Sequence, residues 1–201
     1  ATLPAAGTLK LSGVAVTAGQ SIPVASLGSL VFAPAANANG AGYASFTFQV
    51  QDNGGTANGG VDLDQSANTI TVNVTSVNDA PSGTSKTVTI LEDGSYTFAA
   101  SDFGFTDSSD SPANSLSAVK IATLPAAGTL KLSGVAVTAG QSIPVANLGS
   151  LVFAPAANAN GAGYASFTFQ VQDNGGTANG GVDVDPSSNT ITVDVTAVND
   201  P

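Results

Sequence analysis

The 201-residue sequence contains no cysteine, histidine, methionine, tryptophan or arginine. Without histidine and cysteine there can be no Ser-His-Asp or Cys-His catalytic group, and zinc loses its two commonest ligands. The lack of cysteine also excludes a disulfide framework. These absences remove several large classes of enzyme, and we expect a protein without catalytic activity.

Charge is scarce as well, since charged residues make up 9% of the chain. Fourteen acids, thirteen of them aspartate, face four lysines and give a net charge of −10. This excess of negative charge argues against nucleic acid as a partner. It suits Ca²⁺, which takes about six to eight oxygen ligands. No apolar run approaches the roughly 20 residues that span a bilayer, so we expect no membrane insertion.

A long internal repeat dominates the sequence. The stretch that begins at Ala1 begins again at Ala122, which gives a period of 121 residues. Aligned at this offset, residues 1–80 and 122–201 are identical at 73 of 80 positions. The period is too long for a solenoid unit and fits one β-sandwich domain per repeat. Near-identical tandem copies favour an array that sets length over an enzyme.

Alternation of apolar and polar residues predicts β-strands along the whole chain. Residues 45–50, 69–74 and 86–90 alternate with period two, and residues 8–16 predict a short hairpin. Clusters of Gly, Asn and Asp between these stretches mark turns. No helix-period stretch of about 10 residues is present. We therefore predict an all-β fold, an antiparallel Greek-key β-sandwich.

The repeat divides the chain into a complete sandwich domain at residues 80–201 and the C-terminal part of a repeat domain at residues 1–79. In the complete domain we expect strands at residues 84–91, 96–100, 115–123, 150–153, 166–171 and 190–196, a hairpin at 128–137, an acidic loop at 102–113 and a Gly-rich loop at 173–189. Residues 1–79 lack the counterparts of residues 80–121 and hence the first strands. We expect another chain to pack on residues 1–79, because open strand edges and apolar faces recruit partners.

The segment Val77-Asn78-Asp79-Ala80-Pro81 returns at the end of the chain as Val198-Asn199-Asp200-Pro201. It resembles the VNDAP linker of cadherin-like and VCBS repeats in giant RTX adhesins of bacteria. Residues 91–94, residues 102–110, and residues 151–158 leading into 167–173 resemble the same repeats. The resemblance implies an Ig/cadherin-like extender domain on the surface of a Gram-negative cell, which holds an adhesive tip away from the cell. Neighbouring repeat domains of the same polypeptide are then its partners.

The resemblance also implies calcium at the domain junctions, because animal cadherins bind calcium between an early glutamate, a linker Asn-Asp and an aspartate loop. Asn78 and Asp79 match the linker and Glu92 matches the early glutamate, whereas Asp107-Ser108-Ser109-Asp110 departs from the Asp-x-Asp pattern. Alternating strand directions place the loops at 102–113 and after Asp173 beside the linker, and Glu92 at the opposite pole. The candidate calcium ligands are Asn78, Asp79, Glu92, Asp93, Asp102, Asp107, Asp110, Asp173, Asn199 and Asp200.

Other interpretations stay open. The aspartates can be solvated turn residues that cap their own turns. The domain can also be a binding module that recognises carbohydrate or protein through its loops, or a subunit of an extracellular filament assembled by interchain strand complementation. Near-identity between the copies favours the spacer, because a binding array would exploit variation in its loops.

Overall fold

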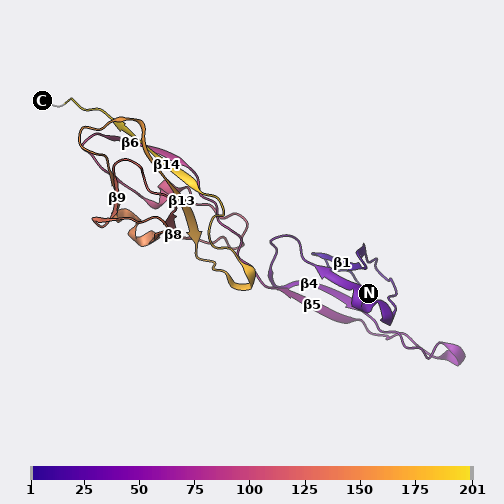
Figure 1. Cartoon of the computed structure of the whole chain (residues 1–201). Coiled ribbons are helices and arrows are strands. Elements are labelled where there is room, and N and C mark those ends of the chain that lie inside the picture. The colour runs from indigo at the N-terminus through magenta and orange to yellow at the C-terminus, as the bar shows by residue number, and fades with distance from the viewer. Residues whose placement is uncertain (1, 200–201) are drawn as a thin grey trace. The chain divides into compact units, whose positions relative to one another are not determined.

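The computed structural model describes residues 2–199 and contains two compact units, Ala1–Ser76 (unit 1) and Val77–Pro201 (unit 2) (Figure 1). In the described residues the regular elements are β-strands and 3₁₀ helices of at most six residues. None of these helices is long and apolar enough to cross a membrane. The prediction of an all-β sandwich fold is confirmed.

Unit 2 is an Ig-like sandwich of two sheets. The first has the strand order β11-β8-β13-β14-β6 and the second has the order β10-β9-β12-β7. The strands are β6 (Lys86–Leu91), β7 (Tyr96–Thr97), β8 (Leu116–Ile121), β9 (Thr129–Leu132), β10 (Val135–Ala136), β11 (Ser142–Pro144), β12 (Leu151–Ala154), β13 (Gly161–Asp173) and β14 (Asn189–Thr196). The 3₁₀ helices η3 (Ala100–Phe103), η4 (Val145–Ser150) and η5 (Ala178–Gly180) lie in the connections.

The core of unit 2 lies between the two sheets. Alternate residues of β13, Phe167, Phe169 and Val171, are buried there, as period-two alternation requires. The segment before β8 supplies aromatic partners: the ring centroid of Phe103 lies 4.9 Å from that of Phe169, and that of Phe98 lies 5.5 Å from that of Phe167. Edge-to-face pairs of this kind contribute about 0.5–1.5 kcal/mol beyond their burial. Residues 98–103 are therefore integral to the core.

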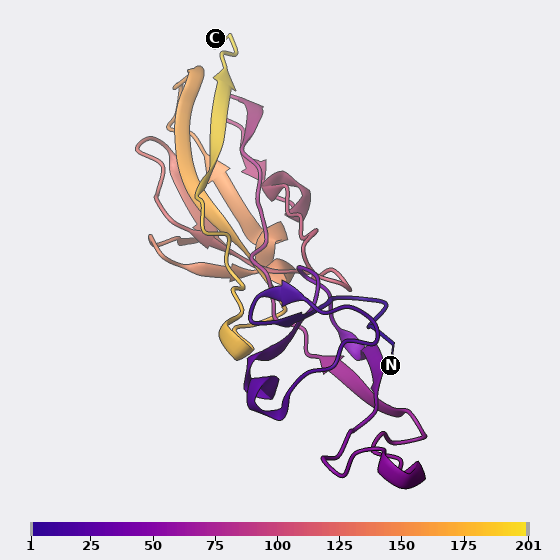
Figure 2. The ribbon, with the colours of Figure 1, turned by 90° about the vertical axis from the view of Figure 1, so that its right-hand side faces the viewer.

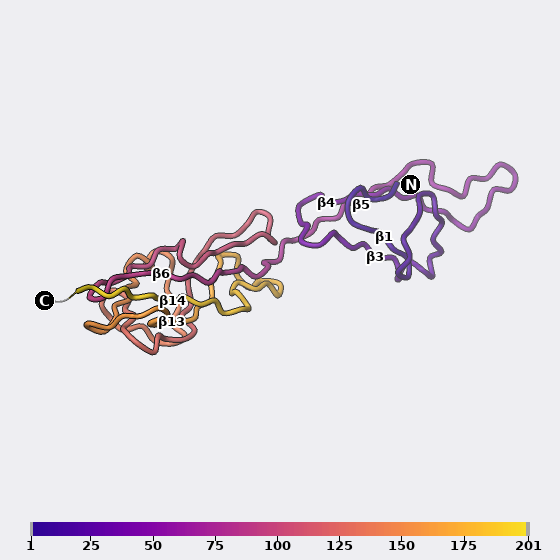
Figure 3. The backbone as a smooth tube through the Cα atoms, turned by 90° about the horizontal axis from the view of Figure 1, so that it is seen from above, coloured from indigo at the N-terminus to yellow at the C-terminus, as the bar shows by residue number. Residues whose placement is uncertain are grey.

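One strand pairing differs from the antiparallel arrangement that the sequence predicts. β6 pairs with β14 in parallel, with Val88 opposite Val193 and Ile90 opposite Val195. Figure 2 shows the yellow β14 between the orange β13 and the magenta β6. The chain enters unit 2 at one pole and leaves at the opposite pole (Figure 3), so its first and last strands run in the same direction. Lying side by side, they must be parallel.

The strand predicted at residues 96–100 is also shorter than expected. β7 ends at Thr97, and the chain turns into η3 at Ala100. The Ala99 N–H donates to Asp102 Oδ2 at 2.8 Å, which closes this turn. Phe103, fully buried at the end of η3, holds the turn against the core.

Unit 1 contains counterparts of only the later elements of unit 2. Its sheets have the orders β2-β1-β3 and β4-β5. The elements are β1 (Thr8–Leu11), β2 (Val14–Ala15), η1 (Val24–Ser29), β3 (Leu30–Ala33), β4 (Gly40–Phe48), η2 (Ala57–Gly59) and β5 (Asn68–Val74). In the described part of unit 1, nothing corresponds to β6, β7 or β8.

Identical sequence forms less strand in unit 1 than in unit 2. Residues 142–144 are β11, paired with β8, whereas the same residues at 21–23 form no strand. In the same way, β13 continues to Asp173 alongside β8, whereas β4 ends at Phe48. Residues 21–23 and the residues that follow Phe48 are therefore not part of a strand in unit 1, because the partner strand is missing.

Candidate cation site at the N-terminal pole of unit 2

Three segments meet where the chain enters unit 2: the linker at residues 77–81, the loop between η3 and β8, and the loop that follows β13. β8 and β13 are antiparallel, and Asp173 at the end of β13 lies opposite Leu116 at the start of β8. The loops attached to these strand ends are therefore neighbours. In Figure 3 both lie at the end of unit 2 that the chain enters. We call this group of segments the acidic pole.

Asn78 attaches the linker to the loop after β13. Its Nδ2 donates to both carboxylate oxygens of Asp173, at 3.1 and 3.2 Å, and to the carbonyl oxygen of Val182 at 2.7 Å. The backbone carbonyl of Asn78 accepts from the Val182 N–H at 2.9 Å. A Cβ atom at Gly175 would clash with the Asn78 amide, so this approach requires glycine there. Both the backbone and the side chain of Asn78 are fixed to unit 2.

The acidic loop before β8 folds onto the same linker. The Asp79 N–H donates to Asp110 Oδ2 at 3.0 Å. Asn114 Nδ2 donates to the same Asp110 oxygen at 3.3 Å and forms a short hydrogen bond to Asn78 Oδ1. The Asn114 N–H donates to Asp107 Oδ2 at 2.8 Å. Of the predicted ligands, the structure thus brings together Asn78, Asp79, Asp107, Asp110 and Asp173.

The acidic pole holds more negative charge than its hydrogen bonds satisfy. Asp107 Oδ1 is buried without a hydrogen-bond partner, which costs free energy. Burial raises the pKa of Asp173; hydrogen bonds from the Gly175 N–H and Asn78 oppose this, and the charges of Asp107 and Asp183 raise it further. In residues 2–199 no lysine forms an ion pair with these carboxylates. A cation would relieve both unfavourable features.

The side chains at the acidic pole suit calcium in their chemistry, because carboxylate and amide oxygens are its preferred ligands. They are not gathered around one point, however. Within the described chain, no three acidic side chains converge closely enough to hold a metal ion. Asn78 and Asn114 instead place N–H donors between the acids. A half-turn of an asparagine amide exchanges its N–H₂ group for its oxygen, so the same side chains can also offer ligands.

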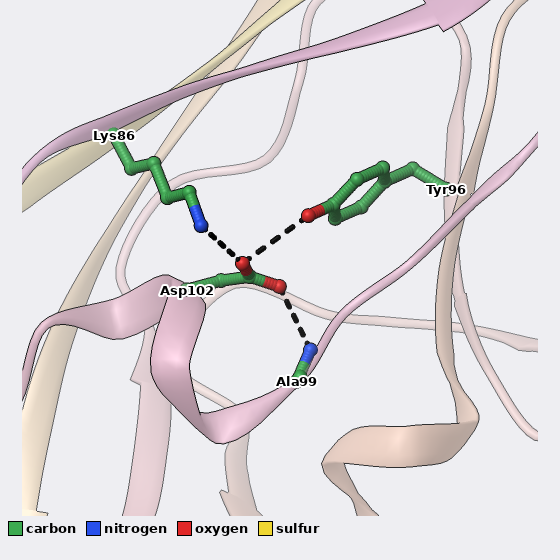
Figure 4. A network of polar contacts seen from close by, with 4 residues as sticks. All are labelled: Lys86, Tyr96, Ala99 and Asp102. Atoms are coloured by element: carbon green, nitrogen blue, oxygen red, sulfur yellow. Dashed lines mark hydrogen bonds and ion pairs between the residues drawn. The ribbon is translucent and has the colours of Figure 1, made fainter.

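Asp102 has a different position and a different role (Figure 4). Its Oδ1 accepts from Lys86 Nζ at 2.6 Å and from the Tyr96 hydroxyl at 3.2 Å, and its Oδ2 accepts from the Ala99 N–H. Burial alone would raise the pKa of Asp102, but the hydrogen bonds from Ala99 and Lys86 outweigh it and hold the pKa below its ordinary value. Both carboxylate oxygens have partners in the domain, so Asp102 stabilises the turn at η3 and lies outside the acidic pole.

The sequence pattern of the bacterial Ig domain family matches residues 78–196, which is more than half of the chain. The chain belongs to the bacterial Ig domain family. No curated protein and no solved structure matches it. Bacterial Ig domains are commonly extracellular or at the cell surface and are typically not enzymes. The match begins at Asn78, so it includes the linker residues that the acidic pole binds.

At the opposite pole of the Ig domain, Glu92 binds the segment that leaves it. Its Oε1 accepts from the Val198 N–H at 2.5 Å and its Oε2 accepts from Asn160 Nδ2 at 2.9 Å. The hydrogen bond from Asn160, followed by that from Val198, lowers the pKa of Glu92. Glu92 therefore fixes the outgoing linker much as the acidic pole fixes the incoming one.

The other predicted ligands at this pole of the Ig domain have fewer contacts. Asp93 Oδ1 accepts from the Asn158 N–H at 3.4 Å. Asn199 is exposed, and Asp200 lies outside the described residues. Calcium binding by these residues stays a prediction.

Two asparagines of the Ig domain belong to the acidic pole but were absent from the predicted ligands. Asn114 bridges Asp110 and Asn78, and Asn174 Oδ1 accepts from the Ser115 N–H at 2.8 Å. Asn114 directly precedes the strand predicted at residues 115–123, and Asn174 is the second residue of the loop predicted at residues 173–189. Short polar side chains at the end of a strand were the signal in the sequence that could have identified them.

Proposed function

We propose that the protein is a structural extender of a large bacterial surface adhesin, in which Ca²⁺ stiffens the junctions between domains. The observation that carries the proposal is the acidic pole, where Asn78 and Asp79 of the linker contact carboxylates from two separate loops. Near-identity of the two copies supports a spacer, because each added repeat then adds length without adding a new binding surface. We further infer that the chain lies outside a Gram-negative cell.

In this proposal Ca²⁺ is held by carboxylates of Asp107, Asp110 and Asp173, together with the linker residues Asn78 and Asp79. The cation supplies positive charge to a place where Asp107 Oδ1 lacks a partner and the pKa of Asp173 is raised. Because carboxylates from both loops and the linker would share one ion, binding would restrict the linker relative to the Ig domain. Glu92 would act in the same way on the segment that leaves the domain.

The first prediction concerns the stability of the chain in calcium. Calcium sites of extracellular modules have Kd values of about 0.1–1 mM. At about 10 mM free calcium, such a site stabilises the folded state by about 1.4–2.7 kcal/mol through mass action. We expect calorimetric titration to detect binding, and thermal melts to show a higher Tm in calcium than in EDTA. Magnesium should substitute poorly, because it requires a smaller octahedral shell.

A matched pair of variants tests whether calcium stabilises the chain through the acidic pole. Asp52 is the counterpart of Asp173 in the first copy, but unit 1 has no counterpart of Asp107 or Asp110. Asp173→Asn should remove most of the calcium-dependent rise in Tm, and Asp52→Asn should leave it intact. Identical melts of the parent chain in calcium and in EDTA would contradict the calcium proposal.

A further inference from the structure

Unit 1 exposes residues whose counterparts form the core of unit 2. Val50 is 60% exposed, Leu27 49% and Ile70 42%. The counterparts of these residues at the 121-residue offset, Val171, Leu148 and Ile191, are buried. Since the surrounding sequence is nearly identical, the difference comes from what covers this face, not from the residues that make it.

In unit 2 this face is covered by the segment at residues 80–121. β6 pairs with β14 along Ile191–Thr196, and β8 pairs with β13 along Phe169–Asp173. The segment inserts these buried apolar side chains between the sheets: Val88, Ile90, Phe98, Phe103, Val119 and Ile121. It therefore completes both the hydrogen bonding and the core of the sandwich.

Unit 1 retains the surface that receives such a segment. Residues 48–52 are identical to residues 169–173, and residues 70–75 differ from residues 191–196 at one position, Asn73 in place of Asp194. That substitution keeps its local contact. Asn73 Oδ1 accepts from the Gly42 N–H at 2.6 Å, and Asp194 Oδ1 accepts from the Gly163 N–H at 2.6 Å.

We propose that unit 1 is an acceptor site for a polypeptide segment with the sequence of residues 80–121. The segment adds one strand parallel to β5 and another antiparallel to β4, as β6 and β8 do in unit 2. The donor is a further copy of this repeat segment, and not residues 80–121 of this chain or of a second copy of the chain. A second copy already uses its own residues 80–121, and lending them would open one sandwich to close another.

Binding of the segment to unit 1 should change the secondary structure of two short stretches. β11 forms in unit 2 because β8 lies beside it, and β13 extends past Phe169 for the same reason. Binding should therefore convert residues 21–23 into a strand and extend β4 through residues 49–52. Both changes bring backbone N–H groups into hydrogen bonds and slow their exchange with solvent.

The test uses the full 201-residue chain and a synthetic peptide of residues 80–121. We expect binding at one peptide per chain, with amide protection gained at residues 21–23 and 49–52. A peptide carrying Val88→Asp and Val119→Asp should not bind. In the chain, Ile70→Asp should weaken binding at least tenfold, because its counterpart is in the core. Val14→Asp is the matched control, since both Val14 and its counterpart Val135 are 72% exposed.

A fusion provides a second measurement that does not depend on the solubility of the peptide. A copy of residues 80–121 placed directly before Ala1 recreates the junction that Ile121 and Ala122 make in the native chain. The fusion should bury Val50 and Ile70 and raise the unfolding midpoint of unit 1 toward that of unit 2. Failure of both the peptide and the fusion to protect unit 1 would overturn the proposal. A stable dimer of the chain that the peptide cannot displace would assign the face to a second copy and overturn it equally.

Discussion

Asp102 and Asp173 are both buried acids of unit 2, but their surroundings shift their pKa values in opposite directions. Hydrogen bonds outweigh burial at Asp102 and lower its pKa. The carboxylate of Asp102 therefore stabilises the fold at neutral pH, and this contribution is lost as the pH falls through its folded-state pKa. At Asp173 burial and neighbouring acids raise the pKa, so the ionised form destabilises the fold once the pH exceeds the ordinary value of 3.8.

The second prediction concerns Asp102. Asp102→Asn removes the ion pair with Lys86 and weakens the cap on the Ala99 N–H, so it should destabilise unit 2 by about 1–3 kcal/mol at pH 7. Urea denaturation from pH 7 to about pH 3 should show the deficit shrinking as the pH falls below the ordinary pKa of 3.8. The carboxylate of the unfolded parent chain then takes up a proton, whereas that of the folded chain stays ionised until its lower pKa is reached.

Two comparisons check the origin of that effect. The exposed Asp52→Asn variant should leave the stability of unit 2 unchanged. The stabilisation by calcium should be the same in Asp102→Asn as in the parent chain, because Asp102 lies outside the acidic pole. If Asp102→Asn were as stable as the parent chain at neutral pH, the ion pair would make no net contribution to the free energy of unfolding.

Among the structural elements, strands with strong alternation could be predicted from the sequence, and those that depend on a distant partner could not. Residues 86–90, 166–171 and 190–196 lie within β6, β13 and β14. β11 could not be predicted, because the identical residues at 21–23 form no strand without β8. Pairing between distant segments, and not local propensity, decides the structure there.

The candidate site could likewise be predicted only in part. Alternating strand directions sufficed to place Asp173 and the acidic loop beside Asn78, because strand direction follows from the order of the strands. Asp102 lies apart from these residues because its neighbour Phe103 is buried in the core, which turns Asp102 toward Lys86. The burial of one aromatic residue in a loop cannot be recognised from alternation.

The third prediction compares the same residue in the two copies. Phe169→Ala should destabilise unit 2 by about 3–5 kcal/mol, because it leaves a cavity beside Phe103 in a closed core. Phe48→Ala should cost unit 1 clearly less, because Phe48 is partly exposed and has no counterpart of Phe103. Urea unfolding followed by the NMR signals of Asn73 and Asp194, which differ between the copies, resolves the two units. Equal losses of stability in the two units would indicate that the exposed apolar face of unit 1 is covered in solution.

At the scale of the whole molecule, the fourth prediction concerns the linker between the units. Asp79→Ala removes a carboxylate but keeps the backbone N–H that binds Asp110, so both units should stay folded. Small-angle X-ray scattering of the parent chain should show a narrower distribution of lengths in calcium than in EDTA, and the variant should lose that difference. A variant that responds to saturating calcium as the parent does would exclude Asp79 as a junction ligand.

The parallel pairing of β6 with β14 has a consequence for how the Ig domain responds to tension. The chain enters beside the start of β6 and leaves beyond the end of β14, so tension between these points pulls the two strands along their length in opposite directions. Their hydrogen bonds lie across that direction and share the load over the six residue pairs from Lys86–Ile191 to Leu91–Thr196. Sliding the strands apart requires breaking these bonds together, whereas peeling would break them singly. We expect the rate of forced unfolding under tension along these strands to depend on this ladder, and tension across the strands to unfold the domain more readily.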